Sequence, residues 1–68
     1  MSSLTETAVD LHVAYEKARR AGSPTDEFLT KTVIPATDRA VAAGADFDSI
    51  HADADRKYGQ WLIDNAGE

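Results

Sequence analysis

Hydrophobic residues recur along this chain every three or four positions, which is the period of an α-helix. The first run, with spacings of 4, 3, 4 and 3, consists of Leu4, Ala8, Leu11, Tyr15 and Ala18. Ser3 and Glu6 have the spacing of a capping box ahead of this run, and Gly22 follows it in a position typical of a helix end. The pattern therefore predicts a first helix over residues 4–21.

A second helix is predicted over residues 24–43, with Ser23 as its N-cap and Pro24 at its first position. Pro35 falls inside it, where a proline removes one backbone hydrogen bond and crowds the carbonyl one turn back. Because apolar residues stay on one side across the proline, we favour a kinked helix over one broken into two. The helix should stop at Gly44, since residues 18–22 and 40–44 both have the form A-x-x-A-G.

A third helix is predicted over residues 46–65, with Asp46 or Asp48 as its cap. Its apolar stripe consists of Phe47, Ile50, Ala54, Tyr58, Trp61 and Leu62. The short links between the three helices favour neighbours that pack against each other, and no strand pattern is present. We therefore expect an all-α fold, a small three-helix bundle forming one domain over residues 1–68.

Composition adds a limit on stability. The chain has 68 residues, of which 43% are hydrophobic and 28% charged. A single core of this size rarely supplies more than about 3–5 kcal/mol of net stability. The sequence contains no cysteine, so close helix packing, oligomerisation or a bound partner has to supply the rest. No apolar run is long enough to span a membrane and the N-terminus does not resemble a signal peptide, so we expect a cytoplasmic protein without membrane contact.

The net charge of −5 lowers the prospect of nucleic-acid binding without excluding it. The first two helices have the short turn of a helix-turn-helix, but the second begins with Asp26 and Glu27, which would repel phosphate. An alternative function is therefore a nucleic-acid-associated regulator of helix-turn-helix type. Its candidate contacts are Arg19, Arg20, Arg56 and Lys57.

Three side chains on one face of the third helix form a metal-ligand pattern. Asp48, His51 and Asp55 fall within about 60° of each other around the helix axis, and they suit zinc or iron. However, a metal site built on one helix needs a further ligand from elsewhere in the chain, and His12 is the only other histidine. The interpretation we favour is a solvated acidic face, with no bound metal and no cofactor. A domain whose fold is stabilised by a bound metal ion is an alternative.

The stretch Asp48-Ser49-Ile50 resembles the D-S-L motif of acidic helical carrier proteins, which bear a phosphopantetheine arm on the serine. The similarity covers three residues, and only 19 residues follow the serine. A carrier-like domain is therefore a lesser alternative. Catalytic motifs are lacking: there is no cysteine nucleophile, no G-x-S-x-G and no glycine-rich phosphate loop, so we expect no enzyme.

Apolar residues that fall off the three stripes are the strongest functional signal. They are Val9, Val13, Ile34, Val41 and Ile63. Single exposed apolar residues are ordinary, and a core wider than one stripe per helix would also absorb them. We favour a surface that binds another protein or a second copy of the chain. The sequence thus predicts a small non-enzymatic interaction module, a regulator or accessory subunit, and a homodimer is one form that it can take.

Overall fold

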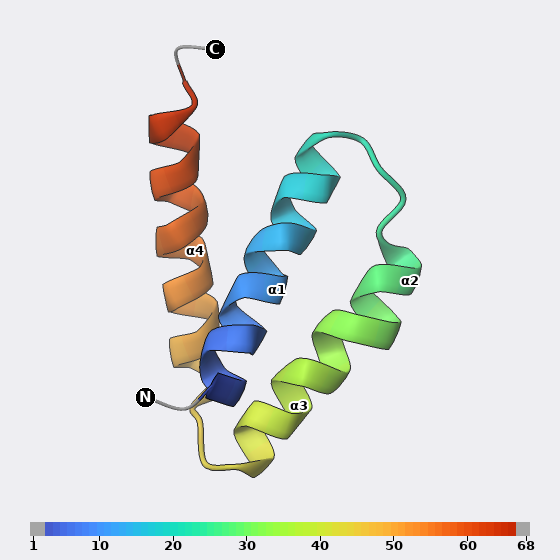
Figure 1. The fold of residues 1–68 in the computed structure, drawn as a ribbon, viewed down its shortest axis with the longest axis vertical. Coiled ribbons are helices and arrows are strands. Elements are labelled where there is room, and N and C mark those ends of the chain that lie inside the picture. The colour runs from blue at the N-terminus through green and yellow to red at the C-terminus, as the bar shows by residue number, and fades with distance from the viewer. Residues whose placement is uncertain (1–2, 67–68) are drawn as a thin grey trace.

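The computed structural model describes residues 3–66, and it confirms an all-α three-helix bundle. The first helix is α1 (Ser3–Arg20). The second runs without a break through α2 (Asp26–Phe28), η1 (Leu29–Val33) and α3 (Ile34–Ala42), and the third is α4 (Phe47–Asp64) (Figure 1). No strand occurs within the described residues. The helix ends differ from the predicted ones by one or two residues.

The two A-x-x-A-G sequences end their helices in the same way, as predicted. Gly22 and Gly44 have positive φ angles of 79° and 107°. After each glycine, the next backbone N–H donates to the carbonyl of the first alanine of the motif: Ser23 to Ala18, and Ala45 to Ala40, both at 3.0 Å. This is the Schellman motif, and glycine is favoured there because a Cβ atom penalises the left-handed conformation.

The start of the second helix was predicted two residues too early. Ser23 belongs to the end of α1, where its backbone N–H donates to the carbonyl of Ala18, and it is not the residue before the next helix. Helix α2 begins at Asp26, after Thr25, whose side chain makes no capping hydrogen bond. At α4 the prediction holds for Asp46, whose carboxylate accepts hydrogen bonds of 3.0 Å from the backbone N–H and the hydroxyl of Ser49. The side chain of Ser3, predicted to cap α1, lies outside what the structure describes.

Pro35 does not break the second helix, because the turn before it is wider than an α-helical turn. In η1, a π-helical segment, the backbone N–H of Ile34 donates to the carbonyl of Leu29, five residues back. Pro35 then falls at the start of α3, close to where a missing N–H is least costly. A π turn is a known alternative to a break at such a position.

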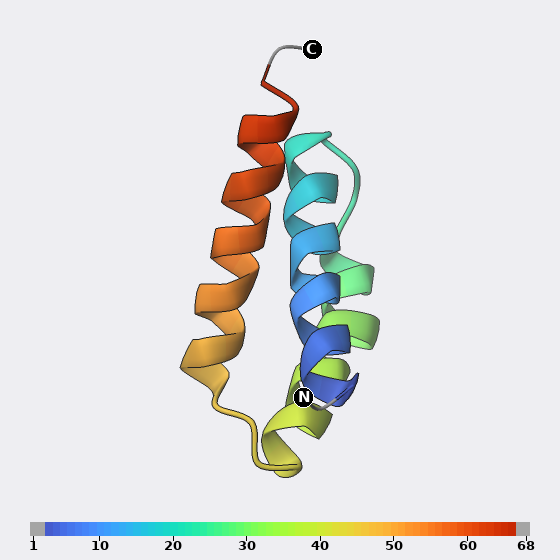
Figure 2. The same ribbon diagram turned by 60° about the vertical axis from the view of Figure 1, so that its left-hand side comes forward.

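Helix α1 is the middle element of the bundle. It packs against both α4 and α3, whereas α3 and α4 make few contacts with each other. Figure 1 shows α3 and α4 joined through the connection at residues 43–46 and diverging toward their other ends, with α1 between them. Figure 2, turned by 60°, shows α4 running alongside α1 over most of its length. The resulting body is thin, with extents of 38 × 25 × 17 Å.

The core is built from small side chains. Its buried cluster consists of Ala8, Val9, Val13, Ala40, Ile50 and Ala54. Ile50 and Val33 are the largest side chains that are fully buried among the described residues. Alanines at the contacts allow the helix backbones to approach closely, so the molecule gains its packing from close approach more than from bulky side chains.

Two predicted surface residues prove to be core residues. Val9 and Val13 are 3% and 9% exposed, so neither forms a second surface for a partner. The prediction was wrong because it assigned each helix one buried stripe. A middle helix contacts two neighbours and buries two sides. Conversely Leu4 and Phe47, both placed on predicted core stripes, are 41% and 51% exposed.

Candidate binding site

A small apolar pocket opens where the three helices come together near the start of α4. Its volume is about 170 Å³. It is lined by His12 of α1, by Leu29, Ile34, Thr37 and Asp38 of the second helix, and by Phe47 and His51 of α4. We call it the histidine pocket. Elements that are distant in the sequence contribute to it, because α1 lies between the other two helices.

One wall of the pocket is held by a chain of two hydrogen bonds. The hydroxyl of Thr37, which is 3% exposed, donates to the carbonyl of Val33 at 2.9 Å. The Nε2 atom of His12 lies 2.9 Å from the same hydroxyl oxygen. Because a hydroxyl has one hydrogen and Thr37 donates it to Val33, Thr37 accepts from His12. Neutral His12 is therefore the tautomer with hydrogen on Nε2, and its Nδ1 keeps a free lone pair.

Three rings form a row along the pocket. The ring centroids of His12 and His51 are 4.6 Å apart, with an angle of 59° between the planes. Those of His51 and Phe47 are 4.5 Å apart, at 52°. Tilted contacts at these distances are favourable for aromatic rings. The row connects the first turns of α4 to the middle of α1.

The environment of His12 lowers its pKa below the ordinary value for histidine. Burial is the main cause, because it disfavours the charged ring, and repulsion by His51 adds to it. The negative charges of Glu16 and Asp55 oppose the shift without reversing it. His12 is thus a neutral hydrogen-bond donor at neutral pH.

Carboxylates without ion-pair partners lie in the pocket and on the adjoining face of α4. Asp38 lines it from α3, while Asp48 and Asp55 lie on the exposed face of α4 that also carries His51. None of these three carboxylates is in an ion pair within residues 3–66. The rim of the pocket is therefore negatively charged and unneutralised.

The predicted metal-ligand set does not form a recognisable centre. Among the described residues, no group of three or more histidine or carboxylate side chains is placed to hold a metal ion. The structure does bring His12 to His51, the further ligand that the sequence called for. However, Nε2 of His12 is already bonded to Thr37.

The three other residues predicted to contact a partner are all exposed. Ile34, Val41 and Ile63 have 46%, 41% and 70% of their surface accessible. Only Ile34 lines the histidine pocket. Val41 and Ile63 do not belong to it.

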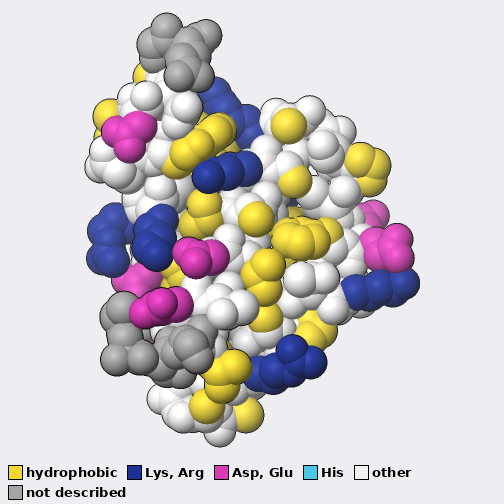
Figure 3. All heavy atoms as spheres, in the orientation of Figure 1, with side chains coloured by type: hydrophobic (Ala, Val, Ile, Leu, Met, Phe, Trp, Pro, Cys, Tyr) yellow, Lys and Arg dark blue, Asp and Glu magenta, His cyan; other side chains and the backbone are white. Residues whose placement is uncertain are grey.

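The bases proposed as nucleic-acid contacts are largely paired with carboxylates. Arg19 lies 3.7 Å from Glu16, Arg56 lies 2.9 Å from Asp53, and Lys57 lies 3.4 Å from Asp10 on the neighbouring helix. On the face drawn in Figure 3, basic, acidic and hydrophobic side chains are intermixed. No histidine side chain is visible in this view.

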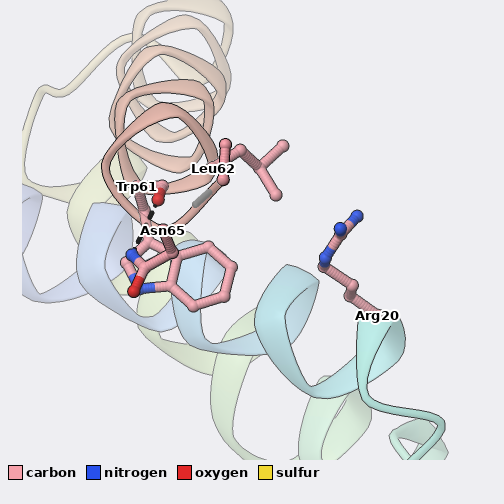
Figure 4. Close-up of a pocket in the computed structure, with 5 residues that line it drawn as sticks. Arg20, Trp61, Leu62 and Asn65 are labelled. Carbon is pink, nitrogen blue, oxygen red and sulfur yellow. Dashed lines mark hydrogen bonds between the residues drawn. The ribbon is translucent and has the colours of Figure 1, made fainter. Parts of the chain in front are cut away.

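A second, larger cleft of about 480 Å³ lies between the C-terminal ends of α1 and α4. It is lined by Arg20, Trp61, Leu62, Asn65 and Ala66. Figure 4 shows the Asn65 amide hydrogen-bonded to the carbonyl of Trp61, at 2.8 Å, and Leu62 on the side of α4 that faces Arg20. The Nζ atom of Lys17 lies 4.8 Å from the ring centroid of Trp61. This cleft is bounded by α1 and α4 alone, so it defines a ligand less sharply than the histidine pocket, which is lined by all three helices.

Sequence reasoning missed Phe47 and Thr37 as pocket residues, and it considered His12 beside His51 only as a possible further metal ligand. Phe47 was placed in the core because it fits the stripe of α4. The divergence of α3 from α4 leaves its ring at the surface. A signal for Thr37 was present, since a lone threonine between alanines on the buried side of a helix needs a hydrogen-bond partner.

Comparison of the chain with models of known protein families, with curated proteins and with solved structures finds no match. None of the helices within residues 3–66 has the length and hydropathy required to cross a bilayer. Function is therefore argued from the geometry of the site.

Proposed function

We propose that this protein is a non-enzymatic protein–protein interaction module whose histidine pocket receives an apolar side chain of its partner. The observation that carries the proposal is the placement of large apolar groups. Ile34 and Phe47, at 46% and 51% exposure, line the pocket from two different helices, while the core is made mainly of alanine and valine. Exposed apolar groups around a concavity are typical of binding sites.

The volume of the pocket is sufficient for one side chain of the partner. A protein cavity of about 150 Å³ is large enough for benzene. The histidine pocket, at about 170 Å³, therefore suits one aromatic or branched aliphatic side chain. Anchors of this kind, seated in a pocket near the centre of an interface, commonly supply most of the binding energy.

The chemistry of the pocket supports binding over catalysis. An activated hydroxyl nucleophile has to donate its hydrogen to a base. Thr37 instead donates to the carbonyl of Val33, and His12 donates to Thr37. The pair is thus arranged to hold α1 and α3 together, and it does not have the hydrogen-bond directions of a nucleophile and its base.

The test is selection of binding peptides with two matched variants. A displayed library of helical peptides is selected against the immobilised protein, and each binder is assayed on both variants. One variant carries Ile34→Ser and Phe47→Ser in the pocket, and the control carries Val41→Ser and Ile63→Ser, two exposed apolar positions outside it. We expect the pocket variant to lose at least about tenfold in affinity and the control to lose little. Peptides that bind the pocket variant as tightly as the unmodified protein would contradict the proposal.

We further propose a cytoplasmic location, which the lack of cysteine in the sequence supports. Fractionation of host cells with an antibody against the protein tests it. Recovery in the membrane pellet or the medium would contradict it.

A further inference from the structure

We infer that the partner of the histidine pocket is a basic amphipathic helical segment, in which one apolar anchor is flanked by lysine or arginine. This inference rests on the proposed function and adds the chemistry of the partner. Its basis is charge complementarity. Asp38 lines an apolar pocket, and Asp48 and Asp55 lie on the side of α4 that carries His51, which also lines it. None of the three carboxylates has an ion-pair partner within the described chain.

The carboxylates belong to two of the helices that line the pocket. Asp38 belongs to α3, and Asp48 and Asp55 belong to α4, on the side of that helix that carries His51. An apolar side chain seated between Ile34 and Phe47 would thus meet the carboxylate of Asp38 at the pocket and those of Asp48 and Asp55 on the neighbouring face of α4. Basic residues one helical turn before and after the anchor extend to the carboxylates on both helices, because lysine and arginine side chains are long and flexible.

Bases of the protein itself do not neutralise this rim. All four ion pairs found within residues 3–66 involve other carboxylates: Glu16, Glu27, Asp53 and Asp10. Asp55 also acts electrostatically on His12, which places its charge near the row of rings. The charge around the pocket therefore remains available to a partner, where it favours association and specificity.

A second copy of the chain fits the site less well than a basic segment. Each copy carries a net charge of −5. A two-fold contact through the pocket would place the same carboxylates of both copies near one another. Like charges at an interface oppose association.

The experiment measures binding of three synthetic peptides of about 14 residues by calorimetry and by ¹H–¹⁵N NMR. The first has leucines on one helical face and lysines elsewhere, the second replaces every lysine with glutamate, and the third replaces every leucine with serine. We expect only the leucine–lysine peptide to bind and to shift the amide signals of Ile34, Phe47 and His51. Its affinity should fall as salt is raised, because exposed charges are screened.

Variants separate the charge inference from the pocket proposal. Asp38→Asn with Asp55→Asn should weaken binding of the leucine–lysine peptide about fivefold to twentyfold. The matched control, Glu6→Gln with Asp64→Asn, removes the same number of charges outside the pocket and should have little effect. Phe47→Ala should lower the affinity for the leucine–lysine peptide about tenfold or more. Circular dichroism confirms that each variant stays helical.

The possible failures are distinguishable. If the glutamate peptide binds as well as the lysine peptide and both need Phe47, the pocket proposal stands and the charge inference is wrong. If the leucine–lysine peptide binds regardless of Asp38, Asp55 and Phe47, it senses only the net charge, and the inference is overturned. If light scattering shows a dimer whose formation needs Phe47, the occupant is a second copy, and the inference is overturned as well.

Discussion

Thr37 is a polar side chain in a core of alanine and valine, and its hydroxyl satisfies two other groups. It accepts from Nε2 of His12 and donates to the carbonyl of Val33. Thr37→Val keeps the shape and leaves the N–H of His12 without a partner, so we expect a loss of about 1–2 kcal/mol in the free energy of unfolding. Urea unfolding measures it.

The same substitution made in a protein that lacks His12 shows whether this loss of stability comes from the hydrogen bond. In a His12→Leu protein the donor is absent, so Thr37→Val should cost about 1 kcal/mol less there. An equal cost in both backgrounds would mean that the hydroxyl stabilises the helix by itself.

The lowered pKa of His12 predicts a dependence of stability on pH. The folded state binds the proton more weakly than the unfolded state, whose pKa is about 6.5. Above that pH both forms are neutral and the full stability is present. As pH falls through about 6.5 and toward the lower folded-state pKa, the unfolded state gains protons first, so the free energy of unfolding falls. Melting temperatures at about pH 7.5 and 5.5 measure the effect.

Two variants assign the effect to His12. Its ring faces His51 and Asp55 of α4 and Glu16 of its own helix, and Asp38 lines the same pocket from α3. His12→Gln retains a donor for Thr37 but does not titrate, so the fall in melting temperature should shrink. His51→Gln removes a repelling charge, and NMR titration should then show a higher pKa for His12. An unchanged pKa would contradict the role given to His51.

Pro35 and the π turn before it form one unit in the second helix. A proline inside a regular α-helix costs about 3 kcal/mol, so its replacement there would be strongly stabilising. Here η1 already avoids the clash, and the packing of Val33, Ala36 and Ala40 on α1 fixes the register after it. We therefore expect Pro35→Ala to change the free energy of unfolding by less than about 1 kcal/mol.

Urea unfolding of the Pro35→Ala protein shows whether the proline strains the second helix. A gain near the full helical penalty of about 3 kcal/mol would show that the proline strains the helix. Loss of the hydrogen bond from Ile34 to Leu29, detected by amide exchange, would show that the π turn depends on the proline alone.

What the sequence predicted correctly was local. The stops at Gly22 and Gly44 and the cap at Asp46 depend on a few neighbouring residues, and all three occur as expected. The errors concern positions whose environment depends on how whole helices are arranged. Val9 is buried because α1 has neighbours on two sides, and Phe47 is exposed because α3 and α4 diverge. The same cause hid the site, since a periodic pattern on one helix cannot show that His12 meets His51.

The thin three-helix body also bears on its state of association, for which the sequence left a homodimer open. The large exposed apolar residues are spread over all three helices among charged groups: Leu4, Ile34, Val41, Phe47 and Ile63. Each copy also carries a charge of −5. Because this charge opposes contact between copies, we expect a monomer of 7.3 kDa at about 25 mM salt, where screening is weak. Light scattering over a range of protein concentrations measures the mass. A dimer at low salt would mean that apolar burial outweighs the repulsion, and Phe47→Ser would then show whether the pocket forms the contact.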